Sequence, residues 1–196
     1  MSVADELVTI LDPRIPEVKL IRPRLFKDAR GYFVESYSRR ALAAAGVTAE
    51  FVQDNHSRSE ASGTVRGLHF QTPPFAQAKL VRCSAGRIFD VAVDIRRGSP
   101  TYGRHVTAEL SAANGWQLLI PIGFAHGLAT LEPGTEVQYK VSADYSPAHD
   151  AGIIWNDPAL GIPWPVGSDA SLLSDKDRKL PAFAGFATPF DYRTPT

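Results

Sequence analysis

Short alternating segments, separated by turn residues, fill most of this chain and most constrain its fold. Between Gly31 and Ser142 the stretches GYFVESYS, EFVQDNHS, TVRGLHFQ, QAKLVRCS, RIFDVAVDI, HVTAEL, WQLLIP, AHGLAT and EVQYKVS each read as one strand. The connections EASG, TPPF, RRGSP, AANG and EPGT are rich in turn-forming residues. This spacing is typical of an antiparallel sandwich or barrel, so we predict a mainly β fold with a few short helices.

Alternation is clearest in EVQYKVS, at residues 136–142. Val137, Tyr139 and Val141 fall on one face of a strand, and the residues between them are polar. We therefore expect Tyr139 to point into the barrel.

Outside the strands, the best helix candidate is RRALAAAG, from Arg39 to Gly46, which is rich in Ala and closed by Gly. The Pro- and Gly-rich region from Asn156 onward is expected to wrap the barrel and to form a helical turn near Ser174–Lys179. The last dozen residues are expected to form a loosely held tail. A single domain over 1–196, with its core at about 17–182, fits this pattern and length.

The composition narrows the classes of function. Lys plus Arg and Asp plus Glu both total 21, which disfavours nucleic-acid or membrane-surface binding by overall charge. The single Cys83 cannot form an internal disulfide, and MSVADELVTI does not resemble a signal peptide. No apolar run approaches the roughly 20 residues that a membrane helix needs. We expect a cytoplasmic location.

Two segments resemble the motifs of cupin barrels. GWQLLIPIGFAH (115–126) is similar to the second cupin motif, and GTVRGLH (63–69) to the start of the first. The second His of that first motif is replaced here by Gln71, so only His69 and His126 are placed as ligands. A catalytic transition-metal site needs about three protein ligands, and we therefore predict no metal. An inward His in such a barrel is suited instead to proton transfer.

A longer series of motifs resembles the dTDP-4-dehydrorhamnose 3,5-epimerases, from about Leu20 to Pro181. The matching segments, in order, are RGYFVE (30–35), FVQDNH (51–56), RGLHFQ (66–71), QAKLVR (77–82), FDVAVDIR (89–96), IPIGFAHG (120–127), YK (139–140), WNDP (155–158) and LSDKD (173–177).

The resemblance implies a cupin-like jelly-roll barrel and an enzyme that needs no cofactor. Its substrate would be a dTDP-4-keto-6-deoxyhexose, inverted at C3 and C5 through an enolate to give the precursor of dTDP-L-rhamnose. His69 would be the base, Asp177 its partner, Lys79 the charge beside the C4 oxygen and Tyr139 the acid.

The resemblance also implies a set of substrate-binding residues. Arg66 would bind the diphosphate, a role that suits the planar guanidinium. Neither GxGxxG nor GxxxxGK[ST] occurs, so a Rossmann or P-loop site is excluded. The other residues assigned to substrate by this likeness are Arg30, Phe33, Glu35, Gln53, Asn55, His126 and Tyr145.

Several of these positions have a structural alternative. A barrel core can also contain hydrogen-bonded side chains with no catalytic role, and this is the alternative for His69, His126 and Tyr139. Asp175 is an alternative to Asp177 as the partner of His69. Arg66 and His69, three residues apart, face opposite ways in an unbroken strand unless Gly67 introduces a bulge or kink.

Other polar residues are expected to be structural. Asp90 and Asp94 share a strand face, where structural hydrogen bonding or pairing with Arg is favoured over catalysis. His56, His105 and His149 are interpreted as structural or surface residues.

Three functions remain open at this stage. They are the double epimerase, a related enzyme that inverts only C3 or isomerises the ketone, and a cupin that binds a sugar nucleotide without catalysis. The family likeness further implies a homodimer in which strands from the chain start pair or exchange, placing 30–35 near the partner's pocket. No nucleic-acid or membrane partner is expected.

Overall fold

Two antiparallel sheets form the body of the protein. The computed structural model describes residues 7–167 and 172–192. One sheet has the order β1-β2-β10-β7-β12-β5 and the other β13-β6-β11-β8-β9. The bounds are β1 (Val8–Ile10), β2 (Lys19–Ile21), β5 (Gln53–Ser59), β6 (Val65–Gln71), β7 (Lys79–Ala85), β8 (Arg87–Asp94), β9 (His105–Ser111), β10 (Gln117–Ile120), β11 (Phe124–Thr130), β12 (Thr135–Val141) and β13 (Asp150–Gly152).

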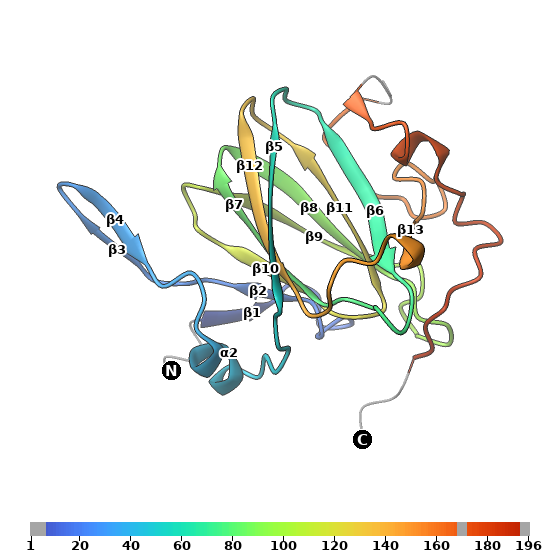
Figure 1. Cartoon of the computed structure of the whole chain (residues 1–196), viewed down its shortest axis with the longest axis horizontal. Helices are drawn as coiled ribbons and strands as arrows, with labels where there is room; N and C mark the ends of the chain where they lie inside the picture. The colour runs from blue at the N-terminus through green and yellow to red at the C-terminus, as the bar shows by residue number, and fades with distance from the viewer. Residues whose placement is uncertain (1–6, 168–171, 193–196) are drawn as a thin grey trace.

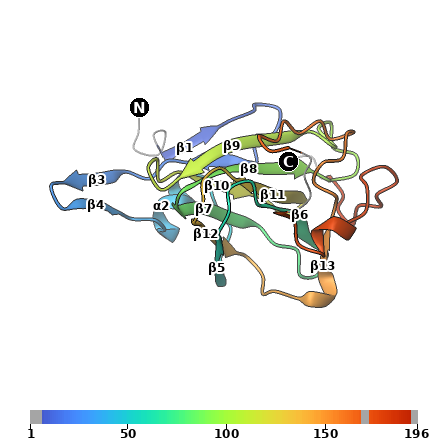
Figure 2. The same cartoon turned by 90° about the horizontal axis from the view of Figure 1, so that it is seen from above.

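The main core lies between the two sheets. Val81, Leu118 and Val137 of the first sheet pack against Ile88 and Leu128 of the second, and all are buried. Figure 1 shows the strands of this body side by side, and Figure 2 shows its two layers from above. The predicted mainly β antiparallel architecture is confirmed.

The strand beginning at Gly31 is shorter than expected and belongs to a separate hairpin. β4 (Gly31–Val34) pairs with β3 (Leu25–Asp28), a strand that the sequence did not indicate. This two-stranded arm projects away from the sheets in both views (Figures 1 and 2). β1, β2 and β13 were also missed, because three-residue strands carry too little alternation to recognise.

The predicted helix near 39–46 is present as α2 (Arg39–Ala44). The Ser38 hydroxyl oxygen caps it by accepting the Ala41 N–H at 3.3 Å, and Gly46 follows with a positive φ of 75°. Leu42 packs with Ile21 and Leu119 and covers the outer face of the first sheet. A 3-10 turn, η1 (Pro147–His149), precedes β13, and η3 (Asp177–Lys179) lies within the predicted helical turn.

The C-terminal region wraps the outer face of the second sheet, as predicted. Val91, Val93 and Ile95 of that face are covered by residues such as Ile153 and Leu160. In Figure 1 this region is the irregular orange-to-red segment along one side of the body.

The expected loose tail is wrong for residues 185–192. Phe190 is 7% exposed and packs edge-on against Phe70, with ring centroids 5.9 Å apart. The Arg97 N–H donates to the Phe190 carbonyl, and the Tyr192 N–H donates to the Arg97 carbonyl, each at 2.9 Å. Burial of Phe190 therefore anchors a segment that composition alone made look free, whereas 193–196 lie outside the described residues.

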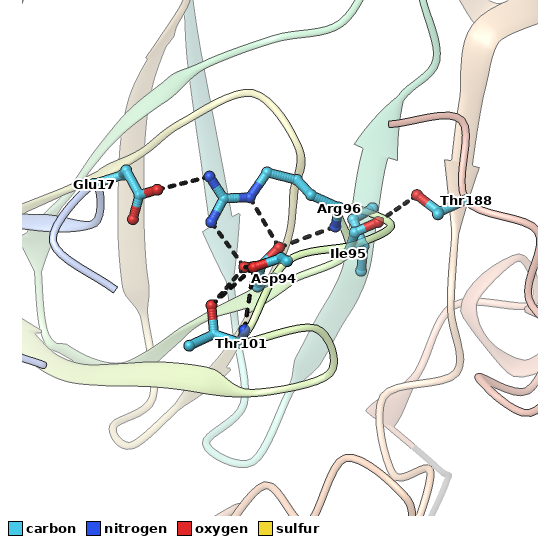
Figure 3. Close-up of polar contacts among 7 residues, drawn as sticks. Glu17, Asp94, Ile95, Arg96, Thr101 and Thr188 are labelled. Atoms are coloured by element: carbon cyan, nitrogen blue, oxygen red, sulfur yellow. Dashed lines mark hydrogen bonds and ion pairs between the residues drawn. The ribbon is translucent and has the colours of Figure 1, made fainter. Parts of the chain in front are cut away.

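A buried ion-pair network fastens the end of β8. Asp94 is fully buried and accepts hydrogen bonds from Arg96, Ser99 and Thr101, and Arg96 also pairs with Glu17 at 2.7 Å (Figure 3). The prediction that Asp94 serves structural hydrogen bonding and Arg pairing is confirmed. The network ties the N-terminal segment to the sheet.

Candidate active site

A distortion of β6 at Gly67 shapes the floor of the site. Gly67 has φ of 120°, and a Cβ there would lie 2.6 Å from both Gly127 Cα and the His126 carbonyl oxygen. The pairing of β6 with β11 shifts register at this point. Consequently Arg66 and His69 line one cavity of about 540 Å³ instead of facing opposite ways. The kink that their spacing requires is present.

His69 is paired with Asp177. His69 Nε2 lies 2.6 Å from Asp177 Oδ1, and the Asp177 side chain is only 3% exposed. Burial by itself raises the pKa of Asp177, but hydrogen bonds from His69 and Gly67 N–H hold that pKa below its usual value. Within the described residues, the alternative partner Asp175 forms no hydrogen bond with His69, so the partner of His69 in the structure is Asp177. This contact holds the ring in one orientation and leaves Nδ1 as the nitrogen that can take up a proton.

Lys79 and Tyr139 come from the opposite sheet. They lie on β7 and β12, where Val141 is paired with Lys79 and Tyr139 with Val81, so both side chains share the inward face. This agrees with the alternation in 136–142. Burial lowers the pKa of Lys79 to about 8, against the opposing effect of the Asp150 and Asp90 carboxylates. Burial raises the pKa of Tyr139, against the opposing charge of Arg66.

A second cavity, of about 370 Å³, adjoins the first. Gln53 and Asn55 line it from alternate positions of β5, and the Gln53 amide donates to Asn55 Oδ1 at 2.8 Å. The Tyr145 N–H donates to Gln53 Oε1 at 3.0 Å, which places this aromatic at the rim. The side chains that line both cavities are His69, Lys79, Tyr139 and Lys176.

Arg66 is prepared for an anion. Its guanidinium donates to the Ser59 hydroxyl at 3.2 Å and to the Arg58 carbonyl at 3.2 Å. Among the described residues it forms no ion pair with a carboxylate, so its charge is available to a phosphate.

Two residues of the site were missed from the sequence. Asp150 accepts the Tyr145 hydroxyl at 3.0 Å and is paired with Lys176, and both line the second cavity. The hydrogen bond to Asp150 raises the pKa of Tyr145. Asp150 begins a three-residue strand that pairs with β6, and a strand this short shows no periodicity in the sequence. Lys176 lies inside the LSDKD motif (173–177), in which the family likeness predicted a role for Asp177 but none for the lysine.

The arm residues do not join this set. Arg30 is exposed and its guanidinium donates to Asp28, while Phe33 is 69% exposed. Phe33 and Glu35 instead line a cavity of about 860 Å³ between the arm, β2 and α2. Within one chain, the predicted substrate residues therefore fall into two separate groups.

His126 lines the cavity of about 540 Å³, and its ring is also bound by a buried carboxylate. Its Nε2 lies 2.7 Å from Asp90 Oδ1, and Asp90 is fully buried. The sequence favoured structural hydrogen bonding over catalysis for Asp90, and the hydrogen bond to His126 agrees with that prediction.

The donor set does not suit a metal ion. Within residues 7–167 and 172–192, no three His, Cys, Asp or Glu side chains gather in a way that would hold one. Nε2 of His69 is paired with Asp177, and Nε2 of His126 is paired with Asp90. No helix in the described part of the chain is long and apolar enough to cross a membrane.

Comparison with known proteins identifies the family. Residues 12–185 match the model of the dTDP-4-dehydrorhamnose 3,5-epimerase family. The chain belongs to the dTDP-4-dehydrorhamnose 3,5-epimerase family. The epimerase of Sinorhizobium fredii is 54% identical over 178 residues, which cover 91% of each chain. The epimerase of Pseudomonas aeruginosa is 54% identical over 171 residues, covering 87% of this chain and 93% of its own.

Solved structures of this epimerase family share the fold. The Bacillus anthracis epimerase, with TDP and pyrophosphate bound, has a TM-score of 0.85 and 52% identity, covering 89% of this chain and 99% of its own. The Legionella pneumophila enzyme, in complex with dTDP-4-keto-L-rhamnose, has a TM-score of 0.87 and 41% identity, covering 95% of this chain and 100% of its own. The predicted cupin-type fold and family are thus confirmed.

Proposed function

We propose that this epimerase inverts C3 and C5 of dTDP-4-keto-6-deoxyglucose by deprotonation and reprotonation, with no cofactor. The observation that carries the proposal is the placement of His69 on one sheet, with its partner Asp177 in η3, and of Lys79 and Tyr139 on the other sheet, around one cavity. A base and an acid on opposite walls are what inversion at carbon requires.

In the first step, the C–H bond beside the C4 ketone breaks and its proton moves to His69 Nδ1. Nε2 is occupied by Asp177, whose carboxylate favours the imidazolium that results. The electron pair of the broken bond spreads onto the C4 oxygen as an enolate. The Lys79 ammonium, which lines this cavity and is desolvated by burial, stabilises that charge.

In the second step, the Tyr139 hydroxyl gives its proton to the opposite face of the same carbon. The raised pKa of Tyr139 keeps the hydroxyl protonated at neutral pH. The tyrosinate and the imidazolium then exchange protons with solvent before the second carbon reacts. Because C3 and C5 are both next to C4, one set of groups serves both.

The nucleotide would occupy the remaining polar groups. Arg66 would pair with the diphosphate, Gln53 and Asn55 would bind around the nucleoside and phosphates, and Tyr145 would lie beside the thymine. His126 would contact the sugar in the cavity of about 540 Å³ that it shares with His69.

We further propose a homodimer that brings the arm to the partner's pocket. Phe26, Tyr32 and Phe33 are 50%, 53% and 69% exposed on a two-stranded hairpin, which by itself is marginally stable in water. Covering them with a second copy would carry Arg30, Phe33 and Glu35 toward the other subunit's nucleotide. A cytoplasmic location stays a prediction from the sequence.

Deuterium exchange tests the function directly. The protein is incubated with dTDP-4-keto-6-deoxyglucose in deuterated water, without added metal, and deuterium at C3 and C5 is followed by NMR. Incorporation at both carbons, lost in His69→Ala, is the expected result. No incorporation by the wild-type protein would reject the epimerase assignment in favour of a binding protein.

A second candidate is a C3-only epimerase. A solved 3'-monoepimerase from Streptomyces bikiniensis matches this chain at 30% identity, with a TM-score of 0.78 and coverage of 86% of this chain. The same experiment separates the two functions, because deuterium at C3 alone would assign this chain to the monoepimerases.

A further inference from the structure

A second histidine–carboxylate pair stands beside the first in the barrel. His126 Nε2 and Asp90 Oδ1 are 2.7 Å apart, and their side chains are 10% and 0% exposed. His126 on β11 is the register partner of His69 on β6, so the two rings are neighbours across the strands. Asp90 is not part of the proton-transfer set proposed above.

The pairing decides which atom of His126 faces the cavity. The ring lines the cavity of about 540 Å³ together with His69 and Tyr139. Since Nε2 is turned to Asp90, Nδ1 is the nitrogen left for a ligand, and among the described residues it has no hydrogen-bond partner. A carboxylate only accepts hydrogen bonds, so an ionised Asp90 requires the proton on Nε2, and in the neutral ring Nδ1 then carries the lone pair.

The surroundings of Asp90 supply one balancing charge. Its carboxylate acts electrostatically on Lys79, which projects from β7. The other ionisable group that responds to it is the buried Cys83 thiol of β7, and β9 presents only Ala108 opposite Asp90. Asp90 Oδ2 is buried and has no hydrogen-bond partner within 7–167 and 172–192. Lys79 therefore supplies a positive charge near the Asp90–His126 pair.

We propose that Asp90 is a positioning residue that fixes His126 as the Nε2–H tautomer, so that Nδ1 accepts a hydrogen bond from a sugar hydroxyl beside the C4 ketone. Lys79 then donates to the ketone oxygen while His126 holds its neighbour. This assignment rests on the proposed function, because the hydroxyl belongs to its substrate. The barrel then contains one histidine, His69, that transfers protons and a second, His126, that positions the sugar.

Asp90→Asn tests the proposal without changing the size of the side chain. The asparagine amide offers an N–H to the ring, which allows His126 to move its proton to Nδ1 and thereby to lose its acceptor. We expect kcat/KM to fall about 10–100-fold, as is usual when a residue that orients a functional histidine is removed. The tautomer is read from ¹H–¹⁵N correlation spectra of the five histidine rings, with His126 assigned through His126→Gln.

Asp94→Asn is the matched control. Asp94 lies on the same strand and the same face, is equally buried, and binds Arg96 instead of a histidine. It is expected to leave the His126 tautomer and the kcat of the folded protein unchanged while lowering stability. An Nδ1–H tautomer in the wild type, or an unchanged tautomer in Asp90→Asn, would overturn the proposal. An equal loss of kcat in Asp94→Asn would also overturn it, because a general packing effect would then explain both variants.

The tautomer separates this proposal from the parent function. If the wild-type protein exchanges no deuterium at C3 or C5, the epimerase function fails, and the sugar contact of His126 fails with it. If exchange occurs but Asp90→Asn retains both its tautomer and its kcat/KM, only the role of Asp90 is rejected.

Discussion

His69 on β6 and Asp177 in η3 are joined by an Nε2–Oδ1 contact of 2.6 Å, although 108 residues separate them in the chain. The carboxylate is nearly inaccessible to solvent and also accepts the Gly67 N–H, at 3.4 Å. The C-terminal wrap therefore completes the site around His69, the proposed base, which lies on β6 of the second sheet.

Asp177→Asn should lower kcat by up to about 10⁴-fold, by analogy with the effect of the same change on a catalytic His–Asp pair in a serine protease. The amide removes the negative charge that stabilises the imidazolium and permits the wrong tautomer. Steady-state kinetics check the effect, and Asp175→Asn is the control. Equal losses in the two variants would contradict the assignment of Asp177.

Tyr139→Phe should separate proton exchange from inversion. His69 still removes a proton and returns a deuteron to the same face, so deuterium enters C3 and C5. Formation of the inverted product should fall about 10²–10⁴-fold because the acid on the opposite wall is gone. NMR of the recovered sugar measures both rates. Loss of exchange and inversion in parallel would remove Tyr139 from the role of acid.

Lys79 should set an alkaline limit on activity. Its pKa is lowered to about 8 by burial, so the ammonium is lost as the pH rises through that value, and kcat should decline above about pH 8. Tyr139 has a raised pKa and stays protonated there. Lys79→Arg retains its charge, so the limb of its residual activity should move to higher pH. A limb that stays near pH 8 in this variant would have another origin.

Asp94 should contribute stability that depends on acid pH. Burial raises the pKa of this carboxyl, but hydrogen bonds from Arg96, Ser99 and Thr101 more than offset it, so the folded pKa is lowered. A lowered folded pKa means that the stabilisation is complete above the unfolded value, about 3.9, and is lost as the pH falls through the folded value. Asp94→Asn should cost about 3–5 kcal/mol at pH 7, because Arg96 then loses a buried partner.

Urea denaturation at pH 7 and pH 3 checks this expectation. The difference in unfolding free energy between wild type and Asp94→Asn should shrink at pH 3, because below about 3.9 the unfolded wild-type chain takes up a proton at Asp94 and part of the carboxylate's contribution to stability is lost. A difference that does not depend on pH would show that Asp94 acts through packing alone.

Phe33→Asp should disrupt the proposed dimer. Phe33 is the most exposed of the arm's aromatic side chains, and a charge there opposes burial against a second copy. Light scattering after size-exclusion chromatography should give a monomer mass for the variant and a dimer mass for the wild type. Tyr102 is exposed on the β8–β9 connection, and Tyr102→Asp serves as a control that should leave the mass unchanged. A monomeric wild type would reject the dimer.

Much of the fold was determined locally by the sequence. Period-two alternation in 136–142 placed Tyr139 inward, and the Ala-rich run that Gly46 closes indicated α2. Such signals depend on neighbouring residues alone. The family motifs added His69, Lys79 and Asp177 as a group, and the structure brings these three side chains to one cavity.

Only the tertiary structure decided the relationships between distant segments. The choice of Asp177 over Asp175, the common cavity of Arg66 and His69 and the place of Asp150 all follow from how β6, β13 and the C-terminal wrap meet. The same holds for the anchored segment around Phe190 and for the pairing of Asp90 with His126. The physical reason is that these contacts depend on packing across the sheets, where burial and a register shift select partners that no local period encodes.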